Sequence, residues 1–234
     1  MTNWYEAHIE KYIPQYAFFS FLCCFAVNCI VYWATQFIRA DAYHYDFTTE
    51  FDRMVPFQPW WVLIYVLSFL FWVVNYSLVS KRSPKEFWFK FASADMLARV
   101  VCGVIFVVIP TTNVRPELAD GGFWNMAMGL IYSLDEPFNL FPSIHCLASW
   151  MCYIGIRRNK DVSTGYKVFS FVFALLICAS TQFTKQHYIV DVVGGLILAE
   201  LCFFVTTHTD GYLKVMAIFD KLTDKVFGKK FNEE

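Results

Sequence analysis

Charged residues are scarce in this sequence. Only 17% of the 234 residues are Asp, Glu, Lys or Arg, whereas about a quarter is usual for a soluble domain. Hydrophobic residues make up 57% and are gathered into long runs. This pattern excludes an ordinary soluble domain and indicates an integral membrane protein. The formal net charge of −1 says little, because the charges are segregated along the chain, and no nucleic-acid partner is expected.

A cysteine pattern typical of metal binding is also missing. The eight cysteines lie within or at the edges of apolar runs, and no pair is spaced with a histidine in a polar loop. We interpret them as small core residues, which reveal no redox compartment, and we expect no metal and no cofactor. We also expect no removable signal peptide, because the first apolar run is too long for one and lacks a small-residue cleavage site.

What the sequence does contain is six apolar runs of spanning or nearly spanning length. The predicted fold is therefore all-α: an integral membrane six-helix bundle with short interfacial helices. One membrane-embedded domain over residues 1–234 is expected, without repeats. The spans are predicted at about 17–38, 60–79, 91–109, 142–156, 166–184 and 188–206.

The connections carry further expectations. Residues 1–16, 122–134 and 211–230 carry apolar residues among polar ones in an amphipathic pattern that predicts interfacial or surface helices. Residues 80–90 are predicted to form a short basic loop, and 39–56 a polar loop. Within the third span, Asp95 and Arg99 are four residues apart, so they can pair on one helix face. That pair is either structural or a support for a functional site.

The distribution of positive charge predicts the orientation. Six spans put both termini on one side, and 14 of the 19 Lys and Arg residues fall on that side, against four on the other. The positive-inside rule then places both termini in the cytoplasm. A bacterial cell membrane is the expected location, with the histidine-bearing loops described next on its outer face.

Two stretches place a histidine where a loop meets an apolar helix. They are FPSIHCLASW at 141–150 and STQFTKQHYIVDVVGG at 180–195. His187 is followed four residues later by Asp191, so the carboxylate can reach the imidazole on the same helix face. Such pairing orients a histidine and raises its basicity.

These residues suit chemistry on a phosphate ester. His187, oriented by Asp191, could attack phosphorus, and His145 could protonate the leaving oxygen. Pro142 suits the first turn of a helix, so backbone N–H groups and the hydroxyl of Ser143 could bind the anion. Further phosphate-binding candidates are Arg115, Lys185 and Ser180.

The motifs resemble the type-2 phosphatidic acid phosphatase superfamily of membrane lipid phosphatases. Its first signature, Lys, six residues, then Arg-Pro, is matched at Arg115-Pro116 but has Val108 in place of lysine. Its second, Pro-Ser-Gly-His, is matched at 142–145 with Ile144 for glycine. Its third, Ser-Arg, five residues, His, three residues, Asp, is matched at Ser180, His187 and Asp191, with Thr181 for arginine.

The resemblance implies a metal-independent lipid phosphatase acting through a phosphohistidine. His187 would be the nucleophile, Asp191 its partner, His145 the acid and base, and Arg115 and Ser143 the phosphate ligands. Lys185 is the nearest substitute for the missing basic residues, with Arg39 or Arg53 as further candidates. The expected partners are a lipid phosphate substrate and membrane lipids.

Other functions stay open at this point. The sequence at 187–192 and the stretch 55–59, Val-Pro-Phe-Gln-Pro, are similar to the inositol phosphorylceramide and sphingomyelin synthase branch, which transfers a head group to a lipid alcohol. A small transporter is another alternative. A haem protein with His145 and His187 as axial ligands is the third, although it would not need Ser143, Arg115 or Asp191.

Overall fold

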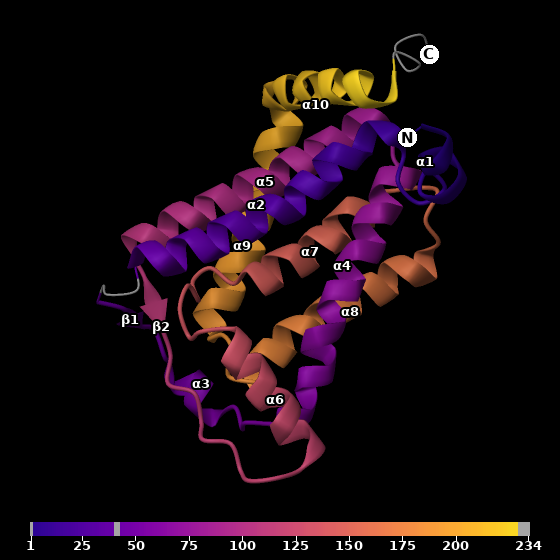
Figure 1. Ribbon diagram of the computed structural model, residues 1–234. Helices are drawn as coiled ribbons and strands as arrows, with labels where there is room; N and C mark the ends of the chain where they lie inside the picture. The colour runs from indigo at the N-terminus through magenta and orange to yellow at the C-terminus, as the bar shows by residue number, and fades with distance from the viewer. Residues whose placement is uncertain (1, 40–42, 229–234) are drawn as a thin grey trace.

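Six apolar helices form the body of the protein (Figure 1). The computed structural model describes residues 2–39 and 43–228. Within them, five helices are long and apolar enough to cross a membrane, and a shorter apolar helix, α7 (Ile144–Ile156), is the sixth. The predicted all-α membrane bundle is thereby confirmed. The five long helices are α2 (Gln15–Arg39), α4 (Val62–Arg82), α5 (Lys85–Val108), α8 (Thr164–Phe183) and α9 (Ile189–His208).

Proline and capping residues set the helix ends. A 3₁₀ turn, η1 (Pro59–Trp61), leads into α4. Only Ser83 and Pro84 connect α4 to α5. Proline suits the start of a helix and disfavours helical conformation in the residue before it, so α4 ends and α5 begins here. The predicted basic loop over 80–90 is therefore wrong: most of its residues are helical, and the connection is a tight turn.

Short helices lie at both ends of the bundle. α1 (Thr2–His8) and α10 (Gly211–Phe227) lie at one end, and α3 (Glu50–Met54) and α6 (Phe123–Leu134) at the other (Figure 1). Three of these, α1, α6 and α10, were predicted from their alternating apolar and polar residues. α3 lies within the stretch predicted as a polar loop.

Two loops at the α6 end are joined by a small parallel sheet. β1 (Tyr45–Asp46) pairs with β2 (Thr111–Thr112). The hydroxyl of Thr111 also accepts hydrogen bonds at 3.0 Å from the backbone N–H groups of Leu140 and Phe141. No pattern in the sequence predicted this sheet. Its consequence is that the segment entering α7 has a fixed path.

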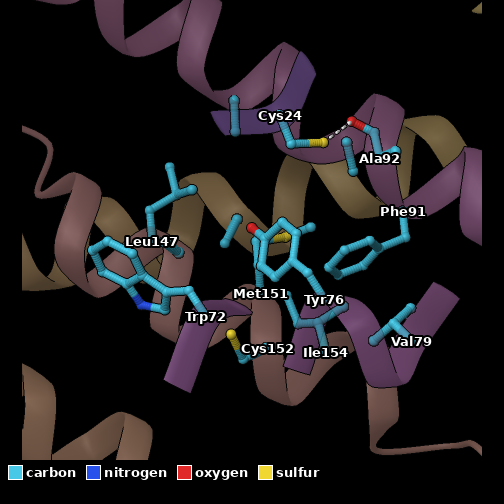
Figure 2. Packing of buried hydrophobic residues seen from close by; sticks show 14 of the residues in the cluster. Cys24, Trp72, Tyr76, Val79, Phe91, Ala92, Leu147, Met151, Cys152 and Ile154 are labelled. Atoms are coloured by element: carbon cyan, nitrogen blue, oxygen red, sulfur yellow. Dashed lines mark hydrogen bonds between the residues drawn. The ribbon is translucent and has the colours of Figure 1, made fainter. Parts of the chain in front are cut away.

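The core is rich in aromatic side chains and comes mainly from α4, α5 and α7, with contributions from α2, α8 and α9. Figure 2 shows Tyr76 facing Phe91, with Met151 of α7 close by; the two rings meet edge to face with centroids 5.0 Å apart. Polar ring atoms are satisfied, as where Trp72 Nε1 donates to Ser149 Oγ at 2.9 Å. α4 and α7 are therefore held together along their length, which fixes the position of the first turn of α7.

Candidate active site

A cavity of about 380 Å³ lies at the α6 end of the bundle. Its walls come from α2, α4, α6, the segment before α7, the start of α7 and the loop between α8 and α9. Most of the lining is apolar, and the polar side chains include both predicted histidines and Arg115. An apolar cavity with a few convergent polar groups is the usual form of a small-molecule site.

The loop between α8 and α9 presents His187 to this cavity. The backbone N–H groups of Gln186 and His187 both donate to the carbonyl of Thr181, at 2.9 and 3.1 Å. The side chain of Gln182 donates to the carbonyl of His187 at 2.9 Å. Lys185 takes a left-handed backbone conformation with φ of 54°, which is uncommon outside glycine. Hydrogen bonds within the segment from Thr181 to His187 thus hold this loop in shape.

Asp191 lies against the ring of His187, as its spacing predicted. Its Oδ2 is 3.4 Å from His187 Nδ1, which is an ion-pair contact rather than a well-formed hydrogen bond. The same oxygen accepts from the backbone N–H of Tyr188 at 2.8 Å, so it also caps α9. Burial lowers the pKa of the His187 imidazole, but the close carboxylate of Asp191, with Asp135 further away, raises it, and the net shift is upward.

His145, the second residue of α7, faces His187 across the cavity. The two ring centroids are 6.2 Å apart, with the ring planes at 51°. Tyr65 stacks on the His145 ring at 4.3 Å, and Phe69 meets it edge-on at 5.7 Å. Within the described residues, His145 Nε2 is a buried nitrogen without a hydrogen-bond partner. The aromatic residues thus hold the ring in place and leave Nε2 without a protein partner.

Arg115 lines the same cavity and is held at both terminal nitrogens. Nη1 donates to the carbonyls of Asp135 and Tyr132, and Nη2 donates to Gln186 Oε1 at 2.7 Å. The guanidinium lies 4.5 Å from the ring centroid of Tyr132. Its Nε is buried and without a partner among the described residues, while burial lowers the pKa of the group. A fixed cation therefore stands beside the two histidines.

Residues 57–205 match the sequence profile of the PAP2 superfamily, which is more than half of the chain. The chain belongs to the PAP2 superfamily. It is also 35% identical over 66 residues to the inositol phosphorylceramide synthase catalytic subunit aur1 of Schizosaccharomyces pombe. That stretch is 28% of this chain and 15% of the relative, so the chain covers only a small part of the relative's length. No solved structure matches this chain.

Ser143, the serine of the second PAP2 signature, does not line the cavity. It is the N-cap of α7, its hydroxyl accepts from the N–H of Cys146 at 3.3 Å, and its own N–H donates to the carbonyl of Asp191 at 3.0 Å. Pro142 precedes the cap, so the expectation that it occupies the first turn is wrong. The N–H of Ser143 is therefore engaged, and its hydroxyl accepts one hydrogen bond from its own helix.

The other predicted phosphate ligands lie outside the cavity. Ser180 is buried within α8 and donates to the carbonyl of Ile177 at 2.7 Å. Lys185 Nζ donates to the carbonyls of Asp52 and Val55, at 2.7 and 2.6 Å, and lines a second cavity of about 580 Å³ beside α3. Lys185 therefore anchors the α3 segment to the His187 turn.

The positions where this chain departs from the PAP2 signatures are apolar or internally bonded. Val108 is 67% exposed at the end of α5. Thr181 is buried and donates to the carbonyl of Cys178 at 2.8 Å.

Arg53 is exposed and paired with Glu50, and the side chain of Arg39 lies outside the described residues. Among described residues, Arg115 is the one basic Lys or Arg side chain that lines the histidine cavity.

Two residues that no sequence motif indicated, Tyr65 and Asp135, lie near His145. Tyr65 OH lies 3.4 Å from His145 Nδ1 and 3.5 Å from Asp135 Oδ2. Tyr32 OH donates to the other oxygen of Asp135. Burial raises the pKa of Asp135 to about 6. The only sequence signal for it was the acidic pair Asp135-Glu136 between the helix at 123–134 and the Pro-Ser-x-His motif.

No metal cluster accompanies this site. Among the described residues, no three His, Cys, Asp or Glu side chains are grouped so that they could hold a metal ion. The arrangement offers instead two imidazoles, a fixed guanidinium and a tyrosine–carboxylate pair around one cavity. These groups can bind an anion, attack it and move protons at its edge.

Proposed function

We propose that this PAP2 protein hydrolyses a phosphate monoester or pyrophosphate of a membrane lipid through a phosphohistidine on His187. The observation that carries the proposal is that two imidazoles from separate helices face each other across one cavity, 6.2 Å apart, beside Arg115. Membership of the PAP2 superfamily supports an enzyme of this general class.

In the first step, His187 Nε2 attacks phosphorus. Asp191 lies against Nδ1, so it holds the N–H there and leaves the Nε2 lone pair for the N–P bond. The bond from phosphorus to the leaving oxygen breaks, and that oxygen takes the proton from His145 Nε2. Arg115 Nε, which has no partner among the described residues, donates to a phosphate oxygen as charge develops.

In the second step, water attacks the phosphohistidine and gives its proton to His145. The N–P bond breaks, its electron pair returns to His187 Nε2, and inorganic phosphate leaves. His145 thus serves as acid first and base second, and needs no metal ion for either role. The lipid tail occupies the apolar part of the cavity.

A second candidate is a phosphotransferase that passes the head group to a lipid alcohol. It is favoured by the matched stretch in the inositol phosphorylceramide synthase subunit. The chemistry of both steps is the same, and only the acceptor of the second step differs.

The orientation is part of the proposal. α1 and α10 lie at one end of the bundle and the site lies at the other, near α6 (Figure 1). Together with the Lys and Arg bias, this arrangement supports the proposal that the termini face the cytoplasm and the site faces the outside. The bacterial membrane expected from the sequence stays a prediction.

The test is a phosphate-release screen on purified protein in mixed micelles. Substrates are phosphatidate, phosphatidylglycerol phosphate, isoprenyl pyrophosphate and sphingoid phosphates. His187→Ala and Asp191→Asn should abolish release, while His208→Ala, an exposed histidine at the other end of α9, should not. Wild-type release by His187→Ala would refute the proposal.

Additional readouts separate the alternatives. Exchange of a head group without phosphate release would favour the transferase. A transporter should keep its activity in His187→Ala, and a Soret band in purified protein would favour the haem alternative.

A further inference from the structure

A series of hydrogen-bonded polar residues connects the core of the bundle to the cavity. Asp95 and Arg99 on α5 form the predicted ion pair, with Nε 2.9 Å from Oδ2 and only 3% of Arg99 exposed. Tyr76 OH donates to the other oxygen of Asp95 at 2.6 Å. Ionisable groups at this depth in a membrane bundle are costly and are usually retained for function.

This series of contacts ends at Asn28 on α2, and Asn28 lines the cavity. Arg99 Nη1 donates to Asn28 Oδ1 at 2.5 Å. A guanidinium has donors but no acceptor, so the amide oxygen must be the atom that faces it. The amide of Asn28 is therefore fixed with Nδ2 on the opposite side, and within the described residues Nδ2 has no hydrogen-bond partner.

The Asn28 amide therefore leaves two N–H donors for a ligand. A donor at the edge of an apolar cavity favours ligands that carry an acceptor, because a ligand without one leaves the donor desolvated and unpaired. The charge of Arg99 on the amide oxygen also polarises Nδ2 and strengthens it as a donor.

We propose that Asn28 selects the substrate by donating a hydrogen bond to the carbonyl oxygen of an acyl chain. The substrate class is then a lipid phosphate with ester- or amide-linked acyl chains, rather than an isoprenyl or alkyl phosphate, whose chains carry no acceptor. This inference rests on the proposed function for the placement of a lipid phosphate at the histidines.

The same chain of contacts explains the buried ion pair. Asp95 neutralises Arg99 and holds it by Nε, so that Nη1 is directed at Asn28. Removal of Asp95 or Arg99 would leave an unpaired buried charge and disturb folding. Asn28 is therefore the position at which the inference can be tested.

The test compares phosphatidate with its dialkyl ether analogue, which has the same chain lengths but no carbonyl groups. Wild type should prefer the diacyl substrate by about tenfold in kcat/KM, which is the order expected for one neutral hydrogen bond in a site that excludes water. Asn28→Asp keeps an oxygen acceptor for Arg99 and removes the donors; the charge that it adds acts on both lipids alike, so the preference between them should be abolished. Cys29→Ala, on the same helix and cavity, should keep it.

Binding is measured alongside turnover, by quenching of tryptophan fluorescence, since Trp33 and Trp72 line the cavity. Equal kcat/KM for both lipids in wild type, or an unchanged preference in Asn28→Asp, overturns the inference and leaves the proposed function standing. If wild type releases no phosphate, the binding ratio decides: a preference for diacyl lipid that is lost in Asn28→Asp supports the subsite while the proposed hydrolysis fails. Equal binding overturns the subsite.

Discussion

Gly195→Ala should separate the two histidines without touching either of them. Gly195 lies on α9 where this helix crosses the start of α7, and a Cβ there would lie 2.6 Å from the carbonyl oxygen of Ser143 and 3.2 Å from the N of Leu147. Ordinary contact begins at 3.4 Å, so 3.4 − 2.6 requires a shift of 0.8 Å. The obstacle is backbone, so no side-chain rotation can relieve it.

The shift would move α7, and His145 with it, relative to His187. A displacement of about 1 Å in a catalytic arrangement can cost about 100-fold in rate, and overpacking of this kind costs roughly 1–3 kcal/mol of stability. We therefore expect phosphate release to fall by about 100-fold in Gly195→Ala, with a lowered but measurable Tm. The assay is the initial rate of phosphate release together with a thermal melt in the same detergent.

Two other glycines serve as controls. Gly165→Ala, in the first turn of α8, meets nothing within 4 Å and should keep both activity and Tm. Gly194→Ala meets the ring of Phe141 at 2.5 Å, which is a side chain that can turn, so its effect should be intermediate. Full activity of Gly195→Ala at unchanged Tm would refute the argument that this helix contact sets the distance between the histidines.

Three further predictions concern charge and metal. Asp135→Asn removes a carboxylate that helps to raise the pKa of His187. The imidazole should then stay neutral to lower pH, so the acid limb of the plot of kcat against pH should move to lower pH. An acid limb that does not move would contradict this role of Asp135. Lys185→Met loses two hydrogen bonds to the α3 segment and should lower stability by about 1–3 kcal/mol, measured by urea or thermal unfolding. Its kcat should fall by less than about tenfold; a larger loss at unchanged stability would place Lys185 at the phosphate. Chelator should leave phosphate release unchanged, whereas loss that magnesium restores would contradict metal independence.

The helices could be predicted because the length and composition of each apolar run indicate a membrane environment by themselves. A stretch of about 20 apolar residues has few alternatives to a membrane span, and the His187–Asp191 contact follows from helix spacing alone. The 80–90 loop was misjudged because its basic residues suggested an exposed connection, whereas both flanking helices continue through them to Ser83-Pro84.

The rest of the site depends on contacts between distant residues. Tyr65 reaches His145 across 80 positions and Asp135 across 70, and no local pattern encodes such pairs. Local sequence also does not tell that the Ser143 hydroxyl caps its own helix, or that the Lys185 ammonium binds carbonyls of the α3 segment. Residue type indicates what a side chain can do, while the backbone decides where it points.

The shortness of α7 has a consequence for the bilayer itself. Its 13 residues cover about 20 Å at 1.5 Å per residue, roughly 10 Å less than the hydrocarbon thickness of a typical membrane. If the Ile156 end of α7 lies at one membrane surface, the His145 end lies below the opposite headgroup plane. A lipid would then have to sink, or the leaflet thin locally, before its phosphate met the imidazoles. Reconstitution into phospholipids of decreasing acyl length should accordingly speed turnover until the leaflet matches the helix.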